Sequence, residues 1–274
     1  MPIWFITGAS SGLGRAVALE ALARQHQVVA GYRTAAEVDA FVALSPGHAF
    51  GVVLDVSDEA ATTTTVLDVE TRFGRIDTLV NAAGYGLEGI IEETSLEDFH
   101  RQFDVNLFGS LALMKAVLPG MRQRRSGCII NITSMAGFAP SPGLGAYSAS
   151  KAALTMISEA LAKEVSAFGI KVIAVAPGAF RTDWAGRSMV RSPRSIPDYD
   201  SLMDPIREKR RNFSGNQPGD PQKAAALIVA LPASESLPAN ILLGSDAWEN
   251  VTSRLQTLQD EFASARRQAQ QTDF

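Results

Sequence analysis

The sequence Ile3-Trp-Phe-Ile6 runs directly into Thr7-Gly-Ala-Ser-Ser-Gly-Leu-Gly14. A short continuous apolar run is typical of a strand that is buried on both faces of a parallel sheet. The apolar positions Val17, Leu19 and Leu22 then predict an amphipathic helix that extends to about residue 24. A glycine-rich turn between a strand and a helix lets backbone N–H groups approach a pyrophosphate, so this stretch predicts nucleotide binding. The alternative is a plain glycine-rich turn, because the spacing is G-x-x-x-G-x-G and not G-x-G-x-x-G.

Strands and helices continue to alternate after this first unit. Further strands are expected at residues 27–31, 50–54, 77–80, 128–132, 171–175 and 240–243, and helices at residues 59–73 and 103–122 and from about residue 145 onward. Such alternation predicts an α/β fold with a doubly wound, seven-stranded parallel sheet and helices on both faces. Ligands bind beyond the carboxyl ends of the strands in these sheets, and most of the polar motifs follow a predicted strand.

Composition excludes several classes of protein. The 274 residues carry a net charge of −4, which gives no general attraction to nucleic acid or to an anionic membrane. Cys128 is the only cysteine, so no internal disulfide forms, and the three histidines are scattered without metal-ligand spacing. The histidine and cysteine spacing therefore predicts no metal site. The N-terminus shows neither a signal peptide nor a membrane span, which favours a cytoplasmic protein.

Residues 183–219 interrupt the alternation. They contain Pro193, Pro197, Pro205 and Pro218 among basic and large apolar residues. A long insertion near the mouth of a site is typical of a lid or substrate loop, and the alternative is a mobile surface loop. We therefore expect one domain over residues 1–274, with a cofactor-binding and catalytic core at 1–182, a substrate loop at 183–219, and a helix, strand and helix at 220–274.

Arg33 follows the second predicted strand, and no Asp or Glu occurs from Val28 to Ala36. An acidic residue at this point would bind the ribose hydroxyls of NAD, whereas an arginine neutralises the 2′-phosphate of NADP. The sequence therefore favours NADP(H) over NAD(H), with Arg15 as a second candidate cation. Alternatively, both arginines are solvated surface residues.

Tyr147-Ser-Ala-Ser-Lys151 places a phenol and an ammonium one helical turn apart on the same face. A nearby ammonium favours the phenolate, so the pattern predicts a lowered pKa for Tyr147 and a role in proton transfer. A single Tyr-x-x-x-Lys pattern is also compatible with an ordinary pair on a solvated helix face.

Taken together, these motifs resemble the short-chain dehydrogenase/reductase family, which has a Rossmann fold. The resemblance covers about the first 180 residues, with Asn81-Ala standing where the family more often has Asn-Asn. The final part, with Leu243-Gly-Ser-Asp246, resembles the branch called 17β-hydroxysteroid dehydrogenase-like, which does not by itself imply a steroid substrate. The motifs that carry the resemblance are Thr7-Gly-x-x-x-Gly12-x-Gly14, Asp55, Asn81-Ala-Ala-Gly84, Asn106, Ser134, Tyr147-x-x-x-Lys151 and Pro177-Gly178 with Thr182.

The resemblance implies a role for each matching residue. Tyr147 is the general acid or base, Lys151 lowers its pKa and holds the nicotinamide ribose, and Ser134 hydrogen-bonds the substrate oxygen. Asn106 is implied to hold a water that relays protons toward Lys151. The implied cofactor contacts are Gly8, Ser10, Ser11, Gly12, Leu13, Gly14, Arg33, Asp55, Val56, Asn81, Ala82, Gly84, Tyr147, Lys151, Pro177, Gly178, Phe180 and Thr182. The expected substrate contacts are Ser134, Tyr147, Leu87, Met135, Phe138, Leu144 and Trp184, which favour a hydrophobic ketone or alcohol.

The function predicted from these residues is an NADP(H)-dependent oxidoreductase that interconverts a carbonyl and a secondary alcohol by hydride transfer. The alternative is a catalytically silent NADP(H)-binding regulatory protein, although every catalytic position is filled. A serine hydrolase is a third possibility, but Ser134 does not lie in a G-x-S-x-G elbow. The family commonly pairs subunits through the helices that carry Asn106 and Tyr147, so a homodimer or homotetramer is expected as well as a small-molecule substrate.

Overall fold

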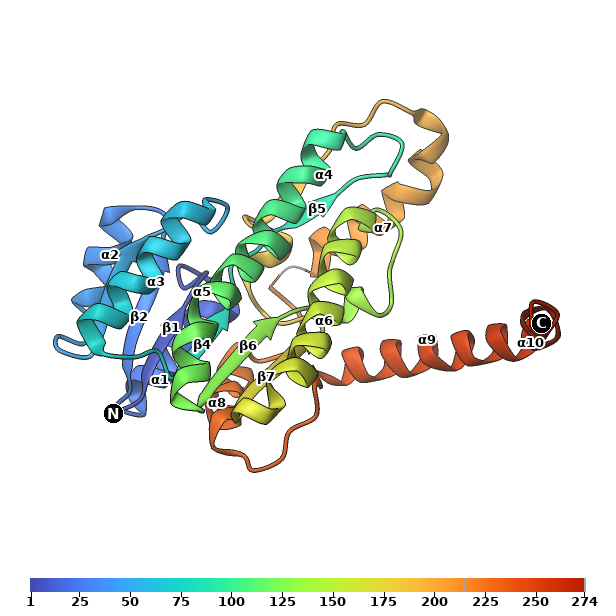
Figure 1. Cartoon of the computed structure of the whole chain (residues 1–274). Helices are drawn as coiled ribbons and strands as arrows, with labels where there is room; N and C mark the ends of the chain where they lie inside the picture. The colour runs from blue at the N-terminus through green and yellow to red at the C-terminus, as the bar shows by residue number, and fades with distance from the viewer. Residues whose placement is uncertain (214, 274) are drawn as a thin grey trace.

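Seven parallel strands form the centre of the computed structural model, which describes residues 1–213 and 215–273 (Figure 1). The strands are β1 (Ile3–Ile6), β2 (Gln27–Tyr32), β3 (Ala49–Val53), β4 (Thr78–Asn81), β6 (Gly127–Ile132), β7 (Ile170–Pro177) and β9 (Asn240–Leu243). Their order across the sheet is β3-β2-β1-β4-β6-β7-β9, so the chain runs outward in opposite directions from the β1–β4 pair. The predicted fold class, a single Rossmann-like α/β domain, is confirmed.

Helices pack on both faces of this sheet. The first apolar cluster joins the sheet to α1 (Gly12–Ala23), α2 (Ala35–Val42) and α8 (Pro221–Ala230). The second joins the opposite face to α3 (Glu59–Phe73), α5 (Gly109–Arg124) and α6 (Gly145–Val165).

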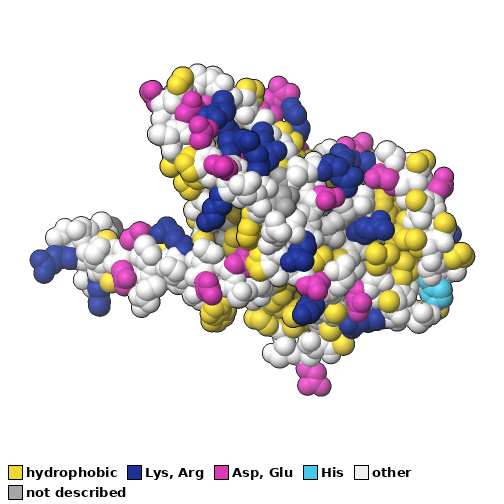
Figure 2. Space-filling view, turned by 180° about the vertical axis from the view of Figure 1, so that it is seen from behind, with side chains coloured by type: hydrophobic (Ala, Val, Ile, Leu, Met, Phe, Trp, Pro, Cys, Tyr) yellow, Lys and Arg dark blue, Asp and Glu magenta, His cyan; other side chains and the backbone are white. Residues whose placement is uncertain are grey.

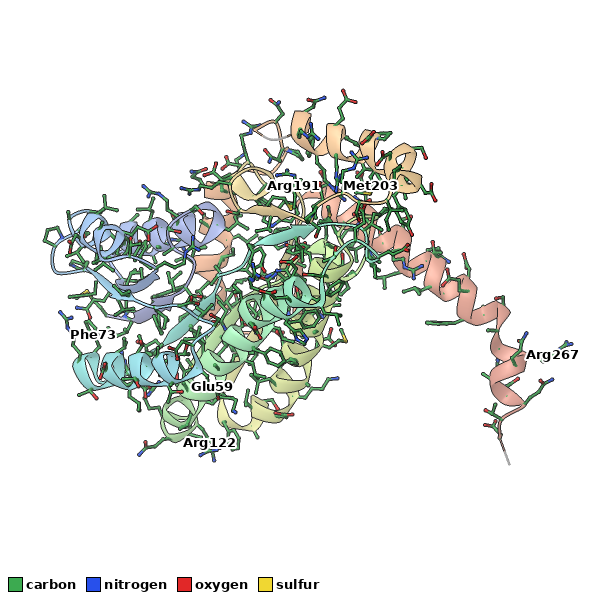
Figure 3. The ribbon with its side chains drawn as sticks, turned by 90° about the horizontal axis from the view of Figure 1, so that it is seen from above. Glu59, Phe73, Arg122, Arg191, Met203 and Arg267 are labelled. Atoms are coloured by element: carbon green, nitrogen blue, oxygen red, sulfur yellow. The ribbon has the colours of Figure 1, made fainter. Side chains whose placement is uncertain are left out.

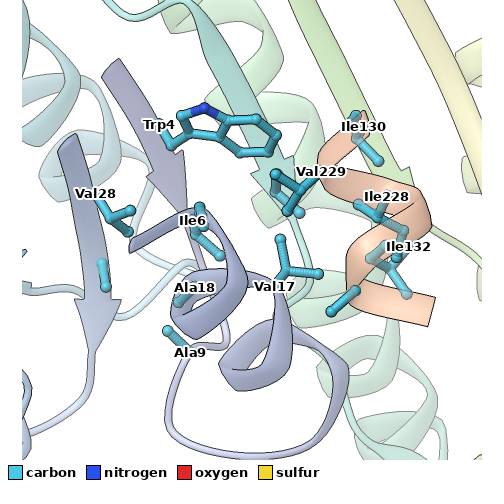
Figure 4. Packing of buried hydrophobic residues seen from close by; sticks show 14 of the residues in the cluster. Trp4, Ile6, Ala9, Val17, Ala18, Val28, Ile130, Ile132, Ile228 and Val229 are labelled. Atoms are coloured by element: carbon cyan, nitrogen blue, oxygen red, sulfur yellow. The ribbon is translucent and has the colours of Figure 1, made fainter. Parts of the chain in front are cut away.

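Strand β1 shows why its sequence is apolar at every position. Trp4 and Ile6 belong to the cluster beneath α1 and α8 (Figure 4), whereas Ile3 and Phe5 belong to the cluster on the other face. Successive side chains of a strand point to opposite faces, so a strand covered on both sides needs apolar residues throughout.

The expected continuous helix at residues 103–122 is wrong in one respect. The structure has α4 (Leu96–Phe103), then a π-helical segment at Asp104–Phe108, then α5. A π-helical turn holds more residues than an α-helical turn, which shifts the faces of the helix on either side of it. Asn106 lies in this segment and hydrogen-bonds the backbone of Tyr85, a contact that periodicity alone does not predict.

The segment at 183–219 is more regular than a loop. It contains η4 (Asp183–Ala185), β8 (Met189–Arg191), η5 (Pro197–Tyr199) and α7 (Asp200–Phe213). Strand β8 pairs in parallel with β5 (Gly86–Glu88), which lies outside the main sheet. Figure 3 shows Arg191 of β8 and Met203 of α7 on the same outer part of the molecule, and Met203 is buried.

A buried carboxylate fixes this segment to the body. Glu88 of β5 accepts hydrogen bonds from Arg207 (3.1 Å) and Arg210 (2.9 Å) of α7 and forms an ion pair with Arg191 of β8 (3.5 Å). The Glu88 side chain is only 1% exposed, so its charge depends on these guanidinium groups for compensation.

The chain ends in a long helix, α9 (Ser245–Ser264), followed by α10 (Arg266–Gln270). Figure 1 shows α9 pointing away from the sheet and its covering helices. The remaining short turns are η2 (Met135–Gly137), η3 (Ser166–Phe168) and η6 (Leu231–Ala233).

The packing of α8 gives a direct test of the first cluster. Ile228 is fully buried against α1 and the sheet, whereas its neighbour Leu227 is 43% exposed. We expect Ile228→Ala to lower the free energy of unfolding by about 2–4 kcal/mol, because it leaves a cavity in a packed core. Leu227→Ala is the matched control and should change it by less than about 0.5 kcal/mol. Urea denaturation measures both, and equal losses would contradict this assignment of faces.

Candidate active site

A cavity of about 1030 Å³ lies along the carboxyl ends of the central strands. It reaches from Arg33 and Asp55, beyond β2 and β3, past the turn that precedes α1, to Tyr147 on α6 and Trp184 in the 183–219 segment. This is the edge where doubly wound sheets bind ligands, and it contains the point at which strand order reverses.

The glycine turn between β1 and α1 forms the middle of this cavity. Gly8 has a φ of +68°, and a Cβ there would lie 2.5 Å from the carbonyl oxygen of Ala82. A Cβ on Gly14 would lie 2.3 Å from the carbonyl oxygen of Gly8. These contacts bring the first turn of α1 against the end of β4, and only glycine permits them.

The N-terminus of α1 suits an anion. Its N-cap residue, Ser11, makes no capping hydrogen bond with its side chain, and the first turn holds no acidic residue. The backbone N–H groups of the turn therefore keep their capacity for a negatively charged group in the cavity. Gly8, Ser10, Ser11, Gly12, Leu13 and Gly14 all line the wall, as the sequence predicts.

At the far end the cavity is lined by Arg33 and two carboxylates, Asp55 and Glu37. Hydrogen bonds from the Ser57 side chain and backbone lower the pKa of Asp55, and the charge of Arg33 adds to this effect. Glu37 is held by the hydroxyl of Thr34 in a capping box at the start of α2 (2.9 Å). Among the described residues no carboxylate forms an ion pair with Arg33.

At the other end, Ser134, Tyr147 and Lys151 share one buried corner of the cavity. The Ser134 and Trp184 side chains lie near the Tyr147 hydroxyl, and both act to lower its pKa. The Trp184 ring packs on the Tyr147 ring, with 5.1 Å between their centroids. The Lys151 ammonium donates to the carbonyl oxygen of Ile132 at 2.8 Å.

The predicted lowering of the Tyr147 pKa is wrong for this arrangement. Burial raises the pKa of Tyr147 to about 12, and the hydrogen bonds from Ser134 and Trp184 only partly oppose this. Burial also lowers the pKa of Lys151 to about 8. The pKa of each group shifts toward favouring its neutral form, because burial disfavours the charged form of either side chain.

Asn106 lies next to this corner without lining the cavity. Its side chain accepts a hydrogen bond from the Tyr85 N–H (3.1 Å) and donates to the Tyr85 carbonyl and to the Ser150 hydroxyl. A Cβ on Gly84 would meet both the Asn106 Oδ1 (3.0 Å) and the Lys151 Nζ (3.4 Å). The amide of Asn106 therefore fixes the loop beside Lys151, and the glycine leaves space between the two side chains.

The structure brings most predicted residues to the cavity but not all. Among the predicted cofactor contacts, Asn81 lies outside the wall, because its side chain is buried and donates to the Asn131 Oδ1 (2.8 Å). Among the predicted substrate contacts, Leu87 and Phe138 also lie outside, whereas Met135, Leu144 and Trp184 line the wall. Val56, Ala82, Gly84, Pro177, Gly178, Phe180 and Thr182, which are also predicted cofactor contacts, line the wall.

Several residues of the wall were not predicted. Tyr85, Arg101, Arg210, Gln217 and Asn250 line the cavity, and they come from segments that carry no recognisable motif. Glu37 is the exception, since Thr34 and Glu37 form a recognisable capping box that would have located α2.

Neither a metal centre nor a membrane span is found in the part of the chain that the structure describes. No group of three or more His, Cys, Asp or Glu side chains is arranged to hold a metal ion within residues 1–213 and 215–273. In the same part of the chain, no helix has the length and apolarity needed to cross a bilayer.

The shifted pKa of Lys151 predicts a pH effect on stability. The unfolded chain keeps this proton up to about pH 10.5, whereas the folded protein loses it near pH 8. Stability from this group should therefore rise between about pH 8 and 10.5, by roughly 3 kcal/mol. We expect the unfolding free energy of wild type to rise by that amount relative to that of Lys151→Met over this range. Lys163→Met, at an exposed position of α6, is the control, and a flat difference for Lys151→Met would contradict the shift.

Comparison with known proteins agrees with this geometry. Residues 2–190 match the family described as short chain dehydrogenase. The "Oxidoreductase BOA17" of Botryotinia fuckeliana is 38% identical over 248 residues, covering 90% of each chain. A crystal structure of a short-chain dehydrogenase from Streptomyces avermitilis matches with a TM-score of 0.93 and 39% identity, covering 100% of both chains. A structure described as "ElxO with NADP Bound" matches with a TM-score of 0.72 and 26% identity, over 88% of this chain and 96% of that one.

Proposed function

The chain belongs to the short-chain dehydrogenase family and is an oxidoreductase acting on a CH–OH group with NAD(P). We propose that it interconverts a carbonyl and a secondary alcohol with NADP(H), using Tyr147 as general acid and base. The observation that carries the proposal is the shared cavity, with the hydroxyls of Ser134 and Tyr147 at one end and the glycine turn and Arg33 further along. The catalytically silent regulatory alternative has no observation in its favour, since Ser134, Tyr147 and Lys151 are all present.

The residues of the cavity fit a dinucleotide. The glycine turn and the free N–H groups of α1 suit the pyrophosphate, because no side chain fills that space. Arg33 would meet the 2′-phosphate, Asp55 and Val56 the adenine, and Thr182 the carboxamide. The remaining contacts would come from Ala82, Gly84, Pro177, Gly178 and Phe180. When bound, the nicotinamide cofactor supplies or accepts the hydride.

The protein's own residues handle the proton and the developing charge. In the reductive direction, Ser134 and Tyr147 would donate hydrogen bonds to the substrate carbonyl oxygen, and Tyr147 would pass its proton to that oxygen. A pKa of about 12 keeps the phenol protonated at neutral pH, as an acid must be. Lys151 would hold the nicotinamide ribose and stabilise the phenolate that remains, and Asn106 would fix the loop through which protons are relayed to Lys151.

The cavity also suggests the kind of substrate. Met135, Leu144 and Trp184 give the wall beside Tyr147 an apolar character, which suits a hydrophobic ketone or alcohol. The 183–219 segment would act as a substrate lid, since it contributes Trp184 and Arg210 to the wall. The same proposal includes three further points. The chain belongs to the 17β-hydroxysteroid dehydrogenase-like branch, its subunits pair through the helices that carry Asn106 and Tyr147, and it is located in the cytoplasm.

Replacing Tyr147 tests the mechanism. Tyr147→Phe removes the proton donor, and we expect kcat with NADPH and a responsive carbonyl compound to fall by about 10²- to 10⁴-fold. Tyr199→Phe is the control, because Tyr199 lies outside this cavity and its hydroxyl donates to Glu92 at 2.7 Å. NADPH oxidation is followed by absorbance across a panel of carbonyl compounds. Unchanged turnover in Tyr147→Phe would remove the proposed mechanism.

Replacing Arg33 tests the cofactor preference. Arg33→Asp puts a carboxylate where the 2′-phosphate would lie, so NADPH affinity should fall at least roughly tenfold while NADH affinity changes little. Dissociation constants for both nucleotides are measured by fluorescence titration of wild type and variant. Arg72→Asp, on α3 and outside the cavity wall, controls for the change in net charge. Equal NADPH and NADH constants in wild type would overturn the preference.

A further inference from the structure

Helix α9 is anchored to the body only at its beginning. The Asp246 carboxylate accepts the backbone N–H of Ala179 at 2.7 Å, and Ala247 and Val251 are buried. Beyond Val251 no residue of α9 is buried, and Figures 1 and 2 show the helix standing clear of the body. Figure 3 shows Arg267, just beyond α9, far from the sheet and its covering helices. We call residues 252–270 the arm.

An apolar stripe runs along this helix. Trp248, Leu255 and Phe262 are 64%, 53% and 70% exposed, and they recur every seven residues. Leu258 and Ala265 continue the pattern between and beyond them. A seven-residue repeat with apolar residues alternately three and four apart is the seam of two helices packed side by side. A helix of this length is only marginally stable alone in water, so a stripe of this kind indicates a covering partner.

Two charges flank the stripe at equivalent places of the repeat. Arg254 and Glu261 are seven residues apart and form an ion pair along the helix at 3.4 Å. If a second arm runs antiparallel about an axis between residues 256 and 257, Arg254 of each comes within two positions of Glu261 of the other. The same alignment sets Leu255 against Leu258 of the partner subunit, and Trp248 against the small Ala265 of the partner subunit. In these two layers large residues meet small or medium ones, and each positive charge lies near a negative one.

We propose that the apolar stripe of the arm packs antiparallel against the arm of a second copy of this chain. The contact is closed by a twofold axis between residues 256 and 257, so the same surface serves both copies. An anionic lipid surface fits less well, because the arm mixes both signs of charge, with Arg254, Arg266 and Arg267 beside Asp260 and Glu261. The pairing is independent of the proposed function and uses no residue of the cavity wall.

Charge reversal tests the pairing in solution. Arg254→Glu and Glu261→Arg each place like charges across the antiparallel seam, so either variant alone should lower the mass of the assembly in light scattering at concentrations near the wild-type dissociation constant. We expect dimerisation through the arm to weaken about tenfold in each, from two like-charge contacts per pair. The double variant Arg254→Glu/Glu261→Arg should regain the wild-type mass. Gln256→Glu, exposed and off the stripe, is the matched control and should leave the mass unchanged.

Mixing the two single variants distinguishes antiparallel pairing of two arms from docking of the arm at another surface. One chain then carries two negative and the other two positive charges at positions 254 and 261, so an equimolar mixture should form heterodimers at wild-type affinity. Leu255→Glu should abolish assembly through the arm in every background and leave any pairing through the helices that carry Asn106 and Tyr147 intact, with circular dichroism showing an intact fold. A wild-type protein whose mass matches that of Leu255→Glu, or a mixture that behaves like its separate components, would overturn the proposal. Loss of assembly in Leu255→Glu without any effect of the charge variants would also overturn it, since the arm would then dock elsewhere.

Discussion

The first turn of α1 reaches the seam between β1 and β4 only because Gly8 and Gly14 lack side chains. Each would place a Cβ within 2.5 Å of a backbone oxygen, one from the end of β4 and the other from the turn itself. This contact brings the N–H groups of α1 to the point where the order of strands reverses. The turn lies in the middle of the cavity at the carboxyl edge, with Arg33 and Asp55 on one side of it and Tyr147 on the other.

The reactive corner is governed by the burial of its side chains. Trp184 covers Tyr147, and the surrounding cluster of Ala136, Leu144 and Met189 is apolar. The same burial that raises the pKa of Tyr147 lowers that of Lys151, so neither group is charged without cost. In such a low-dielectric site, a hydrogen bond to a developing oxyanion is stronger than it would be in water, which makes the hydroxyls of Ser134 and Tyr147 effective donors.

Sequence patterns predicted the parts of the fold that depend on local order. The seven strands, α3 at Glu59–Phe73 and β9 at Asn240–Leu243 follow from apolar runs and caps, and the wall residues of the glycine turn follow from the motif. The π-helical segment at Asp104–Phe108 was not predictable in this way, and neither was the contact between its Asn106 amide and Tyr85, which lies 21 residues away in the sequence.

The direction of the Tyr147 pKa shift shows a different limit of sequence reasoning. The spacing of Tyr147 and Lys151 gives their separation along the helix but not the depth at which both are buried. Asn81 shows the same limit, since its position at a strand end suited a cofactor contact while its side chain turns inward to Asn131. Burial and side-chain direction are set by tertiary packing, which a spacing of residues does not record.

Glu88 links the 183–219 segment to the chemistry of the cavity. Its contacts with Arg207 and Arg210 join residues 119 and 122 positions apart, so no local pattern predicts them. Arg210 lines the cavity, and its second nitrogen donates to the Ser141 hydroxyl and the Pro142 carbonyl. The carboxylate therefore both holds α7 in place and occupies a guanidinium that would otherwise offer a free cation to the substrate. The charges of Arg191, Arg207 and Arg210 are thus directed toward Glu88, while Met135, Leu144 and Trp184 give the wall near Tyr147 its apolar character.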